Sequence, residues 1–320
     1  MEQTPVLSVK DIEVVYTQNK KIVHAVNGVS FDMYKGETLG LVGETGAGKT
    51  TIAKSILRVL PDPPAIFKGG QILLDGEDLM AKPEHEMLKV RGKKVAMIFQ
   101  DPMTALNPIM SVGSQIVEVL QLHNDYSKVE AEKKAGDMLE MVGIPRERAI
   151  EYPHQFSGGM KQRVVIAMAL ACDPELLLAD EPTTALDVTI QAQVLNLINE
   201  LKKKYDTSML LITHDLGVVA QTCDKVAVVY AGKIVEYGTK EDIFDHPSHP
   251  YTEGLFNSLP DMERDTERLK PIPGLPPDPT DLPQGCAFWP RCPYATESCK
   301  GEIPYRELTP GHFCRCIKEG

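Results

Sequence analysis

Short apolar runs alternate with amphipathic segments through the first 255 residues of the chain. Short apolar runs are typical of buried parallel strands, partial alternation is typical of strands with one solvated face, and apolar spacings of three and four indicate helices. We therefore expect strands at 7–16, 26–34, 38–42, 95–99, 176–179 and 209–213. We expect helices at 49–60, 112–122, 128–142, 160–171 and 189–205. The order of these elements predicts a mixed α/β fold.

One part of this pattern is almost purely helical, and it predicts a helical subdomain over about 103–170. The longest apolar run, Val164 to Cys172, is far shorter than the roughly 20 residues that cross a bilayer. The N-terminus also lacks a basic start followed by an apolar stretch. We expect neither a membrane-spanning segment nor an export signal.

The prolines mark a change of character near residue 260, because 11 of the 24 lie between Pro260 and Pro310. The stretch 271–279 lacks many backbone donors and favours an extended conformation, as a semi-rigid connector does. We therefore expect one large domain at 1–258 and a small appended domain at 259–320.

Charge narrows the class of partners. The chain has 34 Lys and Arg against 45 Asp and Glu, a formal net charge of −11. That balance argues against a protein that binds nucleic acid by broad neutralisation of phosphates.

A glycine-rich loop, 43–50, follows the expected strand at 38–42 and opens the expected helix. This GxxxxGK[ST] pattern in a strand–loop–helix context predicts a phosphate-binding loop. Its backbone N–H groups would surround anionic oxygens, Lys49 would reach the β- and γ-phosphates, and Thr50 would ligate Mg²⁺.

Two acids, Asp180 and Glu181, end the apolar strand expected at 176–179. In phosphate-loop ATPases, one carboxylate at such a position holds the Mg²⁺ shell, and its neighbour orients and deprotonates the attacking water. The pair alone is weak evidence for catalysis, but the phosphate loop earlier in the chain favours a catalytic role.

The segment Phe156-Ser-Gly-Gly-Met160 places a Ser and two glycines at a helix start. Here the chain resembles the nucleotide-binding subunits of ABC transporters, whose signature is LSGGQ. Phe156 and Met160 depart from that signature, whereas the Ser-Gly-Gly centre is kept. The resemblance covers residues 7 to about 255, and it implies a RecA-like core with an antiparallel β subdomain and a helical subdomain.

The resemblance also implies roles for single residues. Tyr16 is similar to the aromatic residue that stacks on adenine, and Gln100 is similar to the lid glutamine. Ala185-Leu-Asp187 is similar to the loop at the dimer seam, and His214 is similar to the switch histidine. The implied catalytic residues are Glu181, His214, Lys49 and Gln100. The implied Mg²⁺ ligands are Thr50, Gln100 and Asp180. The implied nucleotide-binding residues are Tyr16, Gly43, Glu44, Thr45, Gly46, Ala47, Gly48, Lys49, Thr50 and Thr51.

In that family the signature of one subunit meets the phosphate loop of another. Ser157, Gly158, Gly159 and Met160 would therefore act in trans. One phosphate loop and one signature in the chain imply a second ATPase subunit, with a different chain favoured.

Five of the seven cysteines crowd the last 35 residues. Without an export signal, such clustering indicates metal binding rather than disulfides. Paired CxxC spacing, the usual zinc pattern, is absent, so we favour a [4Fe–4S] cluster, with structural zinc second and unligated buried thiols third.

The run from Gly285 through Cys299, with the closing Gly-His-Phe-Cys-Arg-Cys316, resembles the C-terminal extension of dipeptide and oligopeptide importer ATPases, a group that includes nickel importers. By that pattern the cluster ligands are Cys286, Cys292, Cys299 and Cys316, with Cys314 as the alternative fourth ligand. His312 is a further candidate, for which a structural role is favoured.

Together these resemblances imply an ATPase that energises uptake of short peptides from the cytoplasmic face of the membrane. It would bind ATP, Mg²⁺ and a cluster. Its partners would be two permease subunits and, through the complex, an extracytoplasmic substrate-binding protein, with no nucleic acid. The alternatives are a nickel importer ATPase and a non-transport ABC ATPase with a metal- or redox-sensing tail.

Overall fold

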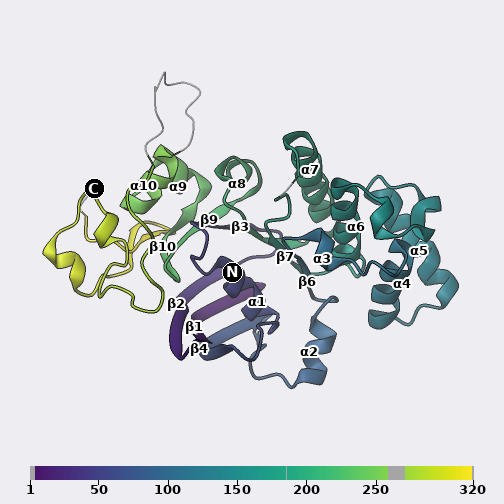
Figure 1. Ribbon diagram of the computed structural model, residues 1–320, viewed down its shortest axis with the longest axis horizontal. Helices are drawn as coiled ribbons and strands as arrows, with labels where there is room; N and C mark the ends of the chain where they lie inside the picture. Colours follow the sequence, from purple (N-terminus) through teal and green to yellow (C-terminus); the bar gives the residue numbers. More distant parts are fainter. Residues whose placement is uncertain (1–3, 185, 259–270, 319–320) are drawn as a thin grey trace. The chain divides into compact units, whose positions relative to one another are not determined.

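The computed structural model describes residues 4–184, 186–258 and 271–318 of the chain (Figure 1). Its contacts divide the chain into two compact units, which we describe separately. The first unit comprises Met1–Val6, Met33–Glu37 and Ala81–Leu211, and the second comprises Leu7–Asp32, Thr38–Met80 and Ile212–Gly320. Each unit is therefore assembled from segments that are far apart in the sequence.

The first unit is built on strands β6 (Val95–Ile98), β7 (Leu176–Asp180) and β8 (Ser208–Ile212), in the order β8-β7-β6. Strands β6 and β7 run parallel, with Val95 opposite Leu176. Every residue of the three strands is buried, which explains why they form continuous apolar runs in the sequence. These strands confirm the expectations for 95–99, 176–179 and 209–213.

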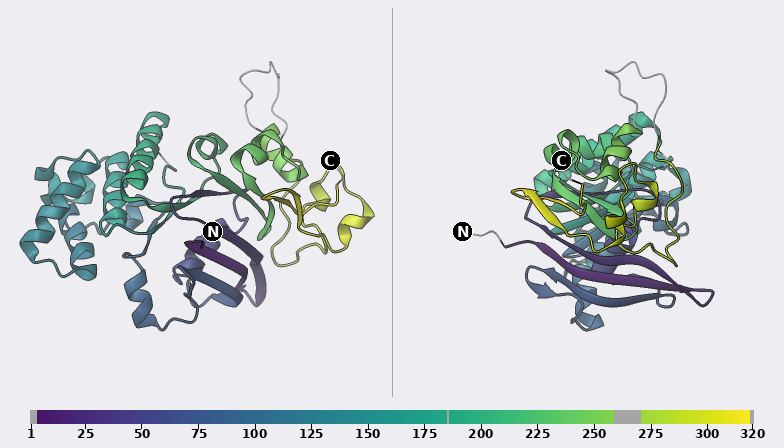
Figure 2. Two further views of the ribbon diagram at one scale, coloured as in Figure 1. Left: turned by 180° about the vertical axis from the view of Figure 1, so that it is seen from behind. Right: turned by 90° about the vertical axis from the view of Figure 1, so that its left-hand side faces the viewer.

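The helices of this unit include a bundle of α4, α5 and α6 (Figure 2). Ser111, Ser127 and Ser157 cap these helices by accepting a hydrogen bond from a first-turn N–H, which confirms the expected helix starts to within two residues. The bounds are α2 (Glu84–Val90), α3 (Pro102–Ala105), α4 (Val112–His123), α5 (Lys128–Met141), α6 (Gly158–Leu170) and α7 (Val188–Tyr205), with the 3₁₀ helices η1 (Arg146–Ile150) and η2 (Pro153–Gln155).

The second unit contains a sheet of order β2-β1-β4-β5. Strands β1 (Leu7–Gln18) and β2 (Lys21–Met33) are joined by Asn19 and Lys20, whose positive φ angles, 49° and 65°, suit a two-residue hairpin turn. Strand β1 also pairs antiparallel with β4 (Ala65–Leu74), and β5 (Glu77–Asp78) pairs with β4. The sequence pattern did not predict β4, because Gly69 and Gly70 interrupt its apolar positions.

The other strands of the second unit have the order β11-β12-β10-β9-β3. Strand β3 (Thr38–Val42) runs parallel to β9 (Lys225–Tyr230), which pairs antiparallel with β10 (Lys233–Thr239). Two strands near the C-terminus, β12 (His312–Cys314) and β11 (Arg306–Thr309), extend this sheet, with Cys314 opposite Glu236. The C-terminal segment is therefore hydrogen-bonded to the strands that precede it.

The helices of this unit are α1 (Lys49–Ile56), α8 (Leu216–Thr222), α9 (Lys240–Asp245) and α10 (Pro250–Asn257), with 3₁₀ helices η3 (Trp289–Arg291) and η4 (Glu297–Lys300). Helix α1 ends before the predicted residue 60, because Arg58 has a φ of 52° that no α-helix contains. No helix in the described parts of the chain is long and apolar enough to cross a bilayer.

The predicted domain division, 1–258 and 259–320 with a helical subdomain at about 103–170, stays a prediction. Its boundary falls beside residues 259–270, which lie outside the described residues.

Candidate active site

The phosphate loop lies between β3 and α1 and depends on two glycines with positive φ. Gly43 has a φ of 148°, and a Cβ there would lie 2.1 Å from the carbonyl oxygen of Val229. Gly48 has a φ of 102°, and a Cβ there would lie 2.3 Å from the carbonyl oxygen of Ala25. Any side chain at either position would clash with backbone, so the tight curl of the loop requires glycine at both.

Lys49 occupies the first position of α1 and is only 6% exposed. Its Nζ donates to the carbonyl oxygens of Gly43 at 2.7 Å and Glu44 at 3.0 Å. The amine therefore links the end of the phosphate loop back to its beginning. Thr45 and Gly46 are exposed, and Thr50 and Thr51 follow in the first turn of α1.

Tyr16, predicted to stack on adenine, lies in β1 of the same unit. Its hydroxyl is 3.2 Å from Oγ1 of Thr51, which places it beside the first turn of α1. The stacking role itself stays a prediction.

Glu44 has contacts that the sequence pattern did not reveal. Its carboxylate accepts hydrogen bonds from Arg291, 247 residues further along the chain, and its backbone N–H donates to the hydroxyl of Tyr251 at 2.8 Å. Hydrogen bonding to Glu44 is the main cause of a raised pKa for Arg291. A small cavity of about 160 Å³ also adjoins the loop and is lined by residues 44–47 and by connector prolines such as Pro276.

In the first unit, the structure brings Gln100 and Glu181 together. The amide Nε2 of Gln100 and the hydroxyl of Thr184 donate to the Glu181 carboxylate at 2.9 and 2.8 Å. Asp180, the preceding residue, ends β7 and is buried. Glu181 has a φ of 46°, a conformation that carries strain in a non-glycine residue and that often marks a functional position.

The signature segment opens α6, where Ser157 is the N-cap and accepts from the N–H of Met160 at 3.4 Å. Gly158 is exposed and Gly159 is half-buried. Arg148 contacts both residues that depart from LSGGQ. Its guanidinium lies over the Phe156 ring at 4.4 Å, and its Nη1 is 3.5 Å from the Met160 sulfur. One arginine therefore supports both ends of the altered signature.

The remaining predicted residues divide between the units. Asp187 is the N-cap of α7 and accepts from the N–H of Ile190 at 2.9 Å, a local role that its type and position could have indicated. His214 is exposed just after β8, and Ala185 lies outside the described residues. Of the predicted Mg²⁺ ligands, Thr50 belongs to the second unit, and Gln100 and Asp180 belong to the first. Their shared role in binding Mg²⁺ stays a prediction.

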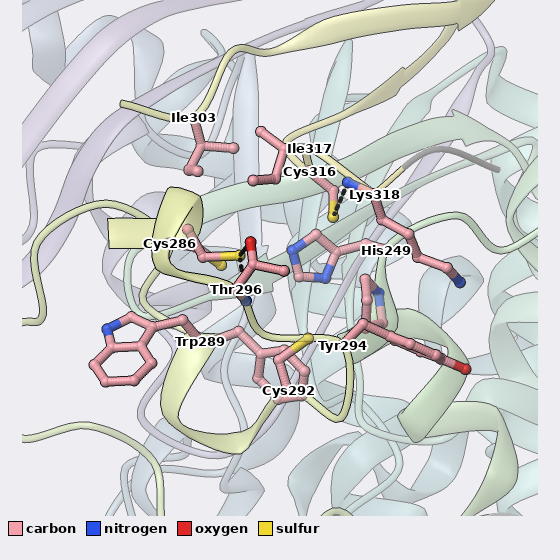
Figure 3. A pocket seen from close by; sticks show the side chains of 13 residues that line it. His249, Cys286, Trp289, Cys292, Tyr294, Thr296, Ile303, Cys316, Ile317 and Lys318 are labelled. Carbon is pink, nitrogen blue, oxygen red and sulfur yellow. Dashed lines mark hydrogen bonds between the residues drawn. The ribbon is translucent and has the colours of Figure 1, made fainter. Parts of the chain in front are cut away.

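Residues of the cysteine-rich tail, together with His249 and Pro250 at the start of α10, line a cavity of about 250 Å³, which we call the thiol cavity. Cys286, Cys292 and Cys316 line it (Figure 3). Cys299 is a further lining residue. Burial raises the pKa of Cys286 to about 11 and also raises that of Cys292, so both thiols are protonated near neutral pH when no cation is nearby. Backbone N–H groups point at two of the sulfurs, from Thr296 to Cys299 and from Lys318 to Cys316.

Two other candidate ligands lie elsewhere. Cys314 is 2% exposed in β12 and is not among the residues that line the thiol cavity. His312 is also buried, and its Nε2 lies 2.9 Å from the Glu236 carboxylate. That contact supports the structural role that the sequence favoured for His312.

His249 also lines the thiol cavity, a position that no sequence motif indicated (Figure 3). Burial lowers its pKa to about 3, so the ring is neutral near pH 7. Its Nδ1 accepts from the N–H of Tyr251 at 3.1 Å, which leaves the ring proton on Nε2. That nitrogen is buried and has no hydrogen-bond partner among the described residues. The cavity therefore has an unpaired N–H donor beside its sulfurs.

The candidate metal-binding side chains of the described residues are not arranged around a single ion. Across the described residues, no group of three or more His, Cys, Asp or Glu side chains is arranged to hold one metal ion. The predicted metal centre is therefore not established by the side-chain positions.

Two family models match the chain. One described as "ABC transporter" matches residues 26–184, and one described as "Oligopeptide/dipeptide transporter, C-terminal region" matches residues 235–299. Solved structures agree with the first match. The ATP-binding cassette MJ0796, in a dimeric post-hydrolysis state bound to ADP and Pi, has a TM-score of 0.66 and 25% identity over 73% of this chain and 98% of that one. The predicted α/β phosphate-loop ATPase fold is thereby confirmed.

A further structure, cbiO1 from Clostridium perfringens, part of the ABC transporter complex cbiONQ, has a TM-score of 0.65 and 25% identity, covering 76% of this chain and 92% of that one.

Curated relatives match nearly the full length of the chain. The oligopeptide transport ATP-binding protein OppD of Escherichia coli is 50% identical over 98% of this chain and 93% of its own. The dipeptide transport ATP-binding protein DppD of Bacillus subtilis is 52% identical over 97% and 94%. The chain belongs to the ABC transporter family, as an ATP-binding subunit of the oligopeptide and dipeptide group.

Proposed function

We propose that this chain hydrolyses ATP to energise the uptake of short peptides through separate permease subunits. The observation that carries the proposal is the full-length similarity to oligopeptide and dipeptide transport proteins, which includes the tail as well as the ATPase part. Nickel is the alternative cargo, and a non-transport ABC ATPase is the alternative class.

The chain is an ABC-type ATPase, and such enzymes bind ATP with Mg²⁺. In our proposal the phosphate loop holds the nucleotide through its N–H groups and Lys49. Glu181 then accepts a proton from the attacking water, and Gln100, which already donates to it, keeps the carboxylate in place. Bound Mg²⁺ would neutralise phosphate charge, with Thr50, Gln100 and Asp180 as its protein ligands.

We further propose that two ATPase subunits close on two nucleotides, with Ser157 to Met160 of each acting on the ATP of the other. Support comes from the dimeric state of the similar cassette and from the exposed start of α6. The assembly would contain a second, different ATPase chain, two permease subunits and an extracytoplasmic substrate-binding protein. The chain would bind peripherally at the cytoplasmic face and would not contact nucleic acid.

Transport into proteoliposomes tests this function. The chain is co-expressed with its neighbouring permease and ATPase subunits, reconstituted, and supplied with ATP on the side that it faces. Uptake of a radiolabelled tripeptide that stops in the Glu181→Gln variant would support the proposal. Uptake of Ni²⁺ alone would establish the nickel alternative, and failure to co-purify with any permease would favour a non-transport ATPase.

We propose that the thiol cavity holds a [4Fe–4S] cluster through Cys286, Cys292, Cys299 and Cys316. Four thiols lining one cavity suit four irons that each take one thiolate. The unpaired Nε2–H of His249 suits the anionic sulfurs of such a cluster. When bound, the cluster would cross-link the irregular tail through its four thiolates.

Zinc, the runner-up, fits less well. The tail lacks the paired CxxC spacing that is usual for structural zinc.

Cysteine variants separate the candidate ligands. We expect about four irons and four sulfides per chain in anaerobically purified protein, most of them lost in Cys316→Ser and retained in Cys314→Ser. The reason is that Cys316 lines the cavity, whereas Cys314 is not among its lining residues and lies in β12, opposite Glu236 of β10. The measurement is iron, sulfide and zinc analysis with a visible absorption spectrum. One zinc without sulfide, or iron lost only in Cys314→Ser, would contradict the assignment.

A further inference from the structure

Arg291 lies in η3 of the tail, directly before Cys292, and its side chain is only 5% exposed. Its two terminal nitrogens donate to the Glu44 carboxylate at 2.7 and 3.0 Å. Its Nε donates to the carbonyl oxygen of Pro273 at 2.9 Å, and Nη1 also donates to the Tyr230 hydroxyl at 3.2 Å. This guanidinium therefore joins the phosphate loop, the proline-rich connector and the end of β9.

The backbone of Glu44 is hydrogen-bonded as well as its side chain. Its N–H donates to the Tyr251 hydroxyl, and its carbonyl oxygen accepts from Lys49. Tyr251 is in turn packed against Tyr230 and against Phe288 of the tail, with ring centroids 4.5 and 5.4 Å apart. The tail thus reaches one residue of the phosphate loop twice, through an ion pair and through an aromatic cluster.

We propose that Arg291 is a positioning residue for ATP binding, which acts through Glu44 to hold the phosphate loop in the conformation that receives the nucleotide. Several backbone N–H groups must point at the same phosphates, and a loop that is already ordered loses less conformational entropy when ATP binds. A bidentate guanidinium–carboxylate pair fixes orientation as well as distance, which a lysine amine does not. This role rests on the proposed binding of ATP by the phosphate loop, and it depends neither on the transported cargo nor on the group that the thiols bind.

A purely anchoring role for Arg291 makes a different prediction. If the side chain only attached the tail, its removal would lower the melting temperature and leave the Kd for ATP unchanged. A positioning role instead raises the Kd and the KM for ATP, with a smaller effect on kcat, because the loop must be ordered when the nucleotide binds.

The test uses the full-length chain with Arg291→Ala, Arg291→Lys, Glu44→Ala and the double variant Arg291→Ala/Glu44→Ala. Binding is measured by competition with a fluorescent ATP analogue, turnover by phosphate release, and folding by melting without nucleotide. We expect Arg291→Ala to raise the Kd for ATP about tenfold, which is the scale of effect expected when the backbone of about one residue must be ordered as the nucleotide binds. The double variant should also lose about tenfold rather than the product of both effects, because both residues act through one contact.

The control variant is Glu297→Ala, which removes an exposed ion pair with Lys300 elsewhere in the tail and should keep the parental Kd. A parental Kd in Arg291→Ala, or multiplied losses in the double variant, would overturn the proposal. Should Arg291→Ala not fold, Arg291→Lys carries the same test, because it keeps the charge and loses the bidentate geometry. A parental Kd and KM in that variant would equally overturn it.

Discussion

Glu181→Gln is expected to lower the turnover number for ATP by about 10²- to 10⁴-fold while ATP still binds, because the variant lacks the base that accepts a proton from water. The substitution is nearly isosteric. The glutamine carbonyl oxygen can still accept from Gln100 and Thr184, which now donate to the Glu181 carboxylate at 2.9 and 2.8 Å. The expected loss is therefore chemical rather than structural. Phosphate release at saturating ATP, together with the Kd for ATP, measures it.

Thr184→Ala is the matched control, since it removes one hydrogen bond to the carboxylate and leaves the base itself. We expect it to lower turnover by no more than about tenfold. Turnover near the parental rate in Glu181→Gln would rule out Glu181 as the general base.

Lys49→Ala is expected to weaken ATP binding by about 2–3 kcal/mol, roughly 30- to 150-fold, because a charged donor to the phosphates is lost. Lys49 is 6% exposed, and its amine already donates to the carbonyl oxygens of Gly43 and Glu44, so it also helps to shape the loop. Isothermal titration with ATP, with and without Mg²⁺, gives the loss in affinity directly.

The control for Lys49→Ala is Lys54→Ala, which removes a lysine from the last turn of the same helix. It should bind ATP as the parent does. An unchanged ATP titration for Lys49→Ala, in protein that melts at the parental temperature, would contradict the role assigned to Lys49.

These substitutions distinguish residues needed for ATP binding from residues needed for ATP hydrolysis. Lys49 and the Arg291–Glu44 pair are expected to affect the affinity for ATP, whereas Glu181 is expected to affect the rate of hydrolysis at saturation. Measuring Kd and kcat for each variant therefore distinguishes a damaged phosphate loop from a missing base.

Patterns of neighbouring residues were enough to predict many of the strands and helices. The strands β3, β6, β7 and β8 are continuous apolar runs because both of their faces are buried, and α4, α5 and α7 show helical spacing because one face of each is packed. The phosphate loop was equally local, since its glycines and its lysine lie within eight residues. Strand β4 was missed where two glycines break the pattern, and α1 was predicted too long because one residue, Arg58, leaves helical geometry.

By itself, the sequence determined the α/β class, the ATPase family, the phosphate loop and the cysteines of the tail, because each depends on residue types at short spacings. Only the tertiary structure decided which distant groups meet. It placed Cys316 rather than Cys314 at the thiol cavity, brought His249 there, and joined Arg291 to Glu44 across 247 residues. The physical reason is that such contacts are fixed by strand pairing and core packing, which place together residues whose separation along the chain carries no periodic signal.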